Sequence, residues 1–173
     1  QSKIKIAQAS SLQIKSQGRK VNPISINNKK KEKTIFQIYK IKVDKKEKYT
    51  IEKNVSIFTS KDKDIKDPLV SAIESAKDSP DFISLYESNK KVWSDLWDIF
   101  DIKVEGHIFS QKALRLHIFH LLETASIHNT KLDVGIPARG LSGESYRGHI
   151  FWDEIFILPV YDFRLPEITQ SSI

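Results

Sequence analysis

Cysteine and methionine are absent from the 173 residues, and glycine and proline occur only six times each. Without cysteine the chain has no disulfide, no thiolate zinc site and no cysteine nucleophile. No run of about 18 apolar residues is present, so the sequence predicts no transmembrane helix, and the start carries no signal-peptide pattern. The first residue is Gln1 rather than methionine. We therefore expect a processed chain or an internal piece of a longer protein.

Acidic residues are scarce in the first part of the chain. Residues 1–66 hold 18 Lys or Arg against 6 Asp or Glu, whereas residues 67–173 hold 10 against 16. The overall charge of +6 raises the question of a nucleic-acid partner. The basic residues are nearly all lysines, however, scattered among Ser, Ile and Asn, as on the exposed face and edges of a sheet. We expect a solvated surface and no nucleic acid.

Apolar and polar residues partly alternate in three segments of this basic part. Residues 4–15, 34–43 and 49–59 are rich in Ile, Val, Thr, Phe and Tyr, which predicts half-buried strands. Between them, residues 27–32 and 44–47 are predicted to be polar turns. Three to five strands cannot close a sheet alone, so this part is interpreted as the tail of a larger β-domain.

Helical periodicity follows the strands. Asp67-Pro68 is a helix-start signal and predicts a short helix over 69–76, which Asp78-Ser79-Pro80 ends. Further helices are predicted over 82–100 and 108–126 from apolar residues at three- and four-residue steps. Strands followed by helices predict an α+β fold.

Two features of these helices could suggest ligands, and both have a structural interpretation. Trp93, Trp97 and Phe100 share one helical stripe, which we expect to pack against a neighbouring domain. His117 and His120 lie three residues apart, but no third ligand stands at a supporting spacing. We expect a structural role for both histidines and no metal site.

Four of the six glycines lie between Gly135 and Gly148, a density that lets backbone approach a partner closely. Aromatic rings stack on the apolar face of a pyranose, while carboxylate and guanidinium groups bind its hydroxyls. Side chains of these types stand among and just after the glycines: Arg139, Glu144, Tyr146, Arg147, His149, Trp152, Asp153 and Glu154. This mixture fits a sugar pocket.

Other chemistries fit this segment less well. The glycine spacing matches no phosphate-binding loop, and Ser142 does not stand in a nucleophile elbow. Stacking on single-stranded nucleic acid is disfavoured by four carboxylates, counting nearby Asp162. A structural glycine-rich turn braced by Arg–Glu pairs remains open from composition alone.

The run Ile136-Pro-Ala-Arg-Gly-Leu-Ser-Gly-Glu-Ser-Tyr-Arg-Gly-His-Ile-Phe-Trp-Asp-Glu-Ile-Phe-Ile-Leu-Pro159 closely resembles the signature of glycoside hydrolase family 65. The resemblance is continuous over about residues 80–173, and residues 1–79 match only in general character. It includes Trp93-Ser-Asp-Leu-Trp97, Leu114-Arg-Leu-His-Ile-Phe-His-Leu-Leu-Glu-Thr-Ala-Ser126 and Leu165-Pro-Glu-Ile168. The family contains maltose, trehalose, kojibiose and nigerose phosphorylases and some α-glucoside hydrolases.

This resemblance implies a domain organisation. Family members have an N-terminal β-sandwich, a helical linker, an (α/α)6 catalytic barrel and a small C-terminal β-domain. Residues 1–66 would then be part of the sandwich, 67–105 the linker helices and 106–173 the start of the barrel. The chain ends at Ile173, where a helix would be beginning, and we expect a break in a longer protein there.

The resemblance also implies a mechanism. Family members cleave α-glucosides with inversion, using a glutamic acid and either phosphate or an activated water. The Phe-Trp-Asp motif forms part of the non-reducing glucose subsite, so Trp152 is expected to pack on the sugar and Asp153 to accept its hydroxyls. Residues assigned to the same substrate-binding wall are Phe151, His149, Arg139, Tyr146 and Arg147, of which the last three are alternatively loop-holding residues.

No catalytic residue is expected in this chain, because the family's general acid lies further along the sequence, beyond Ile173. Glu144 and Glu154 therefore do not form a catalytic pair. Many family members have Phe-Trp-Asp-Thr-Glu where this chain has Phe-Trp-Asp-Glu154. The missing Thr suggests a bacterial subgroup and leaves the role of Glu154 open.

The sequence thus predicts part of an inverting α-glucoside phosphorylase or hydrolase acting on a disaccharide such as kojibiose, maltose or trehalose. No cofactor is expected, and inorganic phosphate is a co-substrate if the enzyme is a phosphorylase. The remaining expectations are a cytoplasmic location (with the periplasm left open), no membrane partner, and association with the rest of its own polypeptide, with a homodimer also open. A non-catalytic carbohydrate-binding or structural protein is the alternative.

Alone, the chain is predicted to be inactive and to expose the apolar side of a helix around 155–160.

Overall fold

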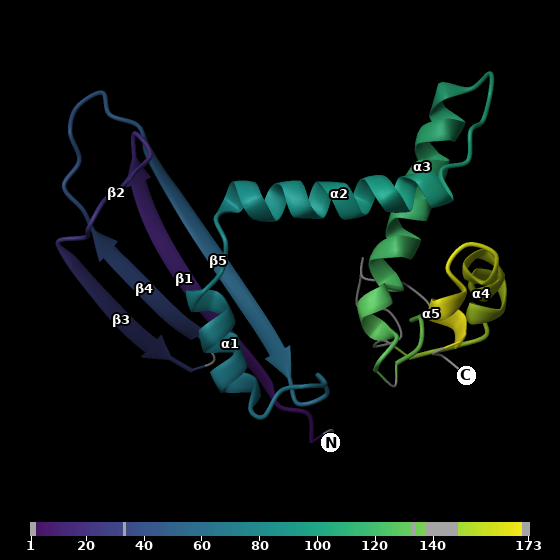
Figure 1. The fold of residues 1–173 in the computed structure, drawn as a ribbon, viewed down its shortest axis with the longest axis horizontal. Helices are drawn as coiled ribbons and strands as arrows, with labels where there is room; N and C mark the ends of the chain where they lie inside the picture. The colour runs from purple at the N-terminus through teal and green to yellow at the C-terminus, as the bar shows by residue number, and fades with distance from the viewer. Residues whose placement is uncertain (1–2, 33, 133, 138–148, 171–173) are drawn as a thin grey trace. The chain divides into compact units, whose positions relative to one another are not determined.

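The computed structural model describes residues 3–32, 34–132, 134–137 and 149–170. Five strands precede five α-helices and a short 3-10 helix within those residues, which confirms the α+β fold class. The chain divides into two compact units, residues 1–85 and 86–173 (Figure 1). The domain boundaries expected from the sequence stay predictions.

A long antiparallel pair forms the centre of the first unit (Figure 1). Strands β1 (Ile6–Ser16) and β5 (Tyr49–Thr59) pair along all 11 residues of each. The short strand β2 (Arg19–Lys20) joins β1 through a turn at Gln17 and Gly18, both of which have positive φ. Such a turn matches the twist of a two-residue hairpin. Alternation in the sequence predicts β1 and β5, whereas β2 lies outside the predicted strands.

A second, two-stranded sheet consists of β3 (Ser25–Lys31) and β4 (Thr34–Lys40). The expectation that residues 27–32 form a turn was wrong, because most of them belong to β3. Every residue of β3 is exposed, so asparagine and lysine side chains cost nothing in burial there, and the ladder to β4 outweighs their low strand propensity. The turn expected at 44–47 is confirmed, with the Glu47 N–H donating to the Asp44 carbonyl over 3.3 Å.

Helix α1 (Pro68–Lys77) packs on one face of the β1–β5 pair. Its start follows from Asp67, whose carboxylate accepts the N–H groups of Leu69 and Val70. Small residues let the helix approach closely: Ala72 and Ala76 are buried, and the Ser75 and Ser56 hydroxyls lie 3.0 Å apart. On the opposite face, the Ser10 hydroxyl of β1 donates to the Gln37 side chain of β4.

The second unit is helical. Helix α2 (Phe82–Phe100) begins in the first unit, and α3 (Ile108–Thr124), the 3-10 helix η1 (Ile127–Asn129), α4 (Glu154–Asp162) and α5 (Pro166–Gln170) follow. One buried cluster joins them: Phe100, Ile118, Leu122, Ala125, Ile136, Tyr161 and Ile168. None of the helices in the described part of the chain reaches the length and apolarity that a bilayer span requires.

The aromatic stripe of α2 packs inside this unit. Trp93 lies 6.4 Å from Trp97 and 4.9 Å from Phe119 of α3, measured between ring centroids. Phe100 lies 5.8 Å from the ring of Tyr161 on α4. The stripe therefore joins α2 to the two helices that follow it.

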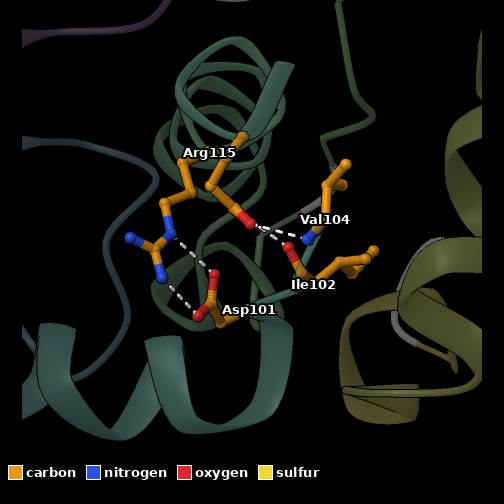
Figure 2. Close-up of polar contacts among 5 residues, drawn as sticks. Asp101, Ile102, Val104 and Arg115 are labelled. Carbon is orange, nitrogen blue, oxygen red and sulfur yellow. Dashed lines mark hydrogen bonds and ion pairs between the residues drawn. The ribbon is translucent and has the colours of Figure 1, made fainter. Parts of the chain in front are cut away.

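A polar cluster fixes the connection between α2 and α3 (Figure 2). Arg115 donates from Nε and Nη2 to the two carboxylate oxygens of Asp101, over 2.8 and 2.6 Å. On the same helix, Gln111 donates to the Ile102 carbonyl and accepts the Val104 N–H over 2.7 Å. The two side chains of α3 thus hold both ends of the segment 101–104.

Replacing Arg115 with Lys should loosen this connection, because lysine cannot donate two parallel hydrogen bonds to one carboxylate. Arg115 also lowers the pKa of Asp101 below its usual value, so the stabilisation should be present at neutral pH and be lost as pH falls through that lowered pKa. Amide exchange at 101–104 should be faster in R115K than in wild type. Lys112→Arg, an exposed change on the same helix, should leave it unaltered.

Tyr161 is the most enclosed large side chain among the described residues, with 0% of its surface exposed. Its hydroxyl has no hydrogen-bond partner within that part of the chain. Burial also raises the pKa of Tyr161 above that of an exposed tyrosine. The ring therefore contributes packing, while the hydroxyl contributes a desolvation cost.

Replacing Tyr161 with Phe should leave the free energy of unfolding unchanged or raise it by about 1 kcal/mol, since the cost of an unpaired hydroxyl disappears. The folded protein retains the Tyr161 proton to higher pH than the unfolded chain, so wild-type stability should fall as pH rises above about 10. The Phe variant should lose that component of the fall.

Chemical unfolding at a series of alkaline pH values measures both effects. Tyr49→Phe is the matched control and should lower the free energy of unfolding. The Tyr49 hydroxyl accepts the Asp44 N–H and donates to Glu47, and the variant loses both bonds. Marked destabilisation by Tyr161→Phe at neutral pH would show that the hydroxyl has a partner after all.

Candidate functional site

The start of α4 presents the Phe151-Trp152-Asp153 sequence. The N–H groups of Ile155 and Phe156 donate to the carbonyls of Trp152 and Asp153, each over 3.1 Å, so these two residues form a turn that runs directly into the first turn of the helix. Asp153 stands at the N-cap position with helical φ and ψ, and its side chain makes no capping hydrogen bond. A carboxylate at this position commonly caps the helix, but within the described residues no capping bond occupies the Asp153 oxygens.

Trp152 is exposed over 68% of its surface. The edge of one ring faces the other in its contact with Phe156, with centroids 5.6 Å apart and planes at 75°. This contact supports the indole from one side and leaves ring surface accessible. A large exposed aromatic ring can stack on a sugar. A neighbouring carboxylate that does not cap its helix can bind the hydroxyls of that sugar.

Two further expected site residues lie immediately before this turn. The rings of His149 and Phe151 are stacked, with centroids 6.2 Å apart and planes at 26°. Both side chains are exposed. Four of the expected site residues therefore lie in the described stretch 149–153, directly after the glycine-rich segment 135–148.

Three expected site residues, Arg139, Tyr146 and Arg147, lie outside the described residues, as does Glu144. Their expected roles stay predictions. The described residues contain no group of three potential metal ligands, and His120 lies 3.2 Å from a carboxylate oxygen of Glu123 on its own helix.

Glu154 has a structural partner that the sequence did not indicate. The Ile136 N–H donates to its carboxylate oxygen over 2.6 Å, across 18 residues of chain. Beside this bond, a Cβ atom added to Gly135 would stand 2.4 Å from the Ile150 side chain and 2.8 Å from the Glu154 oxygen. Residues 135–136 and the first turn of α4 are therefore in direct contact.

Comparison with known proteins places these features in a family. The model of the glycosyl hydrolase family 65 N-terminal domain matches residues 1–96, and that of the family's central catalytic domain matches residues 115–173. The chain belongs to glycosyl hydrolase family 65. The stretch that contains Trp152, Asp153 and Glu154 thus falls in the part that matches the catalytic domain.

Relatives within family 65 are moderately similar. An uncharacterized glycosyl hydrolase of Mycobacterium tuberculosis is 39% identical over 124 residues, which is 72% of this chain and 9% of that protein. A kojibiose phosphorylase of Halothermothrix orenii is 34% identical over 133 residues (71% and 17%). A nigerose phosphorylase of Lachnoclostridium phytofermentans is 36% identical over 130 residues (74% and 17%). The chain thus spans between about a tenth and a sixth of the length of these relatives.

Membership of family 65 confirms the resemblance that the sequence carried, and two of these relatives are named as phosphorylases. What sequence reasoning missed is the partner of Glu154. In the sequence, Glu154 stands out only as an acidic residue at the first position of a helix. That position by itself suggests a favourable interaction with the helix dipole rather than a bond to Ile136.

Proposed function

We propose that this chain forms part of the glucose-binding wall of an inverting enzyme that cleaves an α-glucosidic bond in a glucose disaccharide. The observation that carries the proposal is the first turn of α4, where an exposed Trp152 stands next to an Asp153 carboxylate that does not cap its helix. In this assignment the indole stacks on the non-reducing glucose, and Asp153 accepts hydrogen bonds from its hydroxyls. Phe151 and His149 line the same wall.

The general acid, and the group that binds phosphate or activates water, are assigned to residues outside this chain. An inverting enzyme needs an acid on one face of the sugar and a nucleophile on the other. Trp152 and Asp153 act in this scheme by holding glucose in one orientation between those two groups. Arg139, Tyr146 and Arg147 stay candidates for the same wall.

Phosphorolysis is the reaction that we favour. The relatives named for a substrate are phosphorylases of kojibiose, nigerose, 1,2-α-glucosylglycerol and trehalose 6-phosphate. Inorganic phosphate would then attack the anomeric carbon as the leaving oxygen is protonated. Turnover by the full-length gene product should depend on phosphate, and undiminished turnover in its absence identifies a hydrolase instead.

Replacing Asp153 tests the assignment of the site. In the full-length protein, Asp153→Ala should lower kcat/KM for the preferred disaccharide by about a hundredfold, because charge-assisted hydrogen bonds to sugar hydroxyls are lost. Asp153→Asn, which keeps an acceptor oxygen, should cost about tenfold. Steady-state kinetics measures both values.

Asp162→Asn is the matched control, since Asp162 is an exposed carboxylate at the other end of the same helix. It should leave kcat/KM unchanged. Undiminished cleavage by Asp153→Ala would refute the assignment. Sugar binding by the full-length protein without any cleavage would instead favour the non-catalytic carbohydrate-binding alternative.

A further inference from the structure

Two segments far apart in the sequence meet at the first turn of α4. Glu154, the first residue of the helix, accepts the Ile136 N–H over 2.6 Å. Ile136 itself is only 4% exposed and belongs to the same buried cluster as Tyr161 of α4 and Ile168 of α5. The bond therefore joins the start of α4 to a residue already anchored in the core.

The absence of a side chain at Gly135 leaves room for this contact. A Cβ atom on Gly135 would stand 2.4 Å from Ile150 Cδ1 and 2.8 Å from Glu154 Oε1, both closer than side-chain atoms approach one another. Residues 134–137 therefore lie directly against Ile150 and Glu154. An added methyl group would displace the ends of the Ile150 and Glu154 side chains, and the bond would lengthen because this Glu154 oxygen accepts the Ile136 N–H.

The contact affects the two residues that precede Glu154. Trp152 and Asp153 immediately precede Glu154, and neither is held by a helix-capping bond from its side chain among the described residues. The direction in which they project depends on how the first turn of α4 is held. The Glu154–Ile136 bond is the hydrogen bond across the chain that holds this turn within the described residues.

We infer that Glu154 is a positioning residue, whose bond to the Ile136 N–H, made possible by Gly135, orients Trp152 and Asp153 toward the substrate. This inference rests on the proposed function of those two residues. It assigns Glu154 no proton transfer and no contact with the sugar. One Glu154 carboxylate oxygen accepts a backbone N–H over 2.6 Å, which ties this side chain to its own chain, whereas a general acid must reach the leaving group.

The first experiment compares two variants in the full-length protein. Glu154→Ala removes the acceptor, so amide exchange at Ile136 and over 152–156 should accelerate at least tenfold, and kcat/KM should fall about tenfold through a higher KM. Glu154→Gln retains an acceptor oxygen and should stay within about threefold of wild type in both measurements. The shape of the pH–rate profile should be the same in all three proteins.

Gly135→Ala tests the contact from the other side. It should reproduce the faster exchange and the higher KM of Glu154→Ala although residue 154 is still a glutamate. In the double variant the two losses should be less than additive, because both break one interaction. Glu167→Ala, which removes an exposed glutamate at the start of α5, is the control and should change neither measurement.

Two results would overturn the inference. One is unchanged exchange at Ile136 in Glu154→Ala. The other is a Glu154→Gln variant as inactive as Glu154→Ala with one limb of the pH profile lost, which would identify Glu154 as an acid or base. If the wild-type protein cleaves no α-glucoside, the proposed function fails, while the exchange measurements still decide whether Glu154 holds the turn.

Discussion

The contact between Phe100 and Tyr161 is the constraint on which the helical unit depends. It joins the end of α2 to α4 across a centroid distance of 5.8 Å, and Tyr161 is fully enclosed at that point. Arg164 adds to the same junction, since its guanidinium lies 5.6 Å from the Phe100 ring and it donates to the Ile99 carbonyl. The C-terminal end of α4 is therefore held in the core, and the Glu154–Ile136 bond holds its start.

The two ends of α4 differ in their interactions. Tyr161 is buried without a partner for its hydroxyl in the described residues, whereas Trp152 and Asp153 are left with exposed ring surface and uncommitted oxygens. An exposed indole and an uncapped helix start give up local stability. Functional sites commonly show this pattern, because groups reserved for a ligand cannot also stabilise the fold. One short helix thus has a packed end and an exposed end.

The sequence predicted the elements with strong periodicity and the site with a distinctive motif. Strands β1 and β5 and helices α1 and α2 follow from alternation, helical spacing and the Asp67-Pro68 start signal. Strand β3 was missed because its asparagines and lysines resemble a turn, and only pairing with β4 makes them a strand. The stripe of Trp93, Trp97 and Phe100 was recognised as a packing surface, but periodicity along one helix does not specify that α3 and α4 are its partners.

The glycine-rich segment shows most clearly where sequence reasoning ends. Its glycine density indicated close approach of backbone to a partner, and the sugar was the expected partner. At Gly135 the partners are instead Ile150 and Glu154 of the same chain. The Gly135 backbone itself does not have a positive φ. Glycine here provides space rather than a positive φ. No local pattern distinguishes these two uses, because the atoms that fill the space come from residues 15 and 19 positions further along. Under the proposed function, the contact gives Glu154 a role beside Asp153, because it holds the turn from which Asp153 projects.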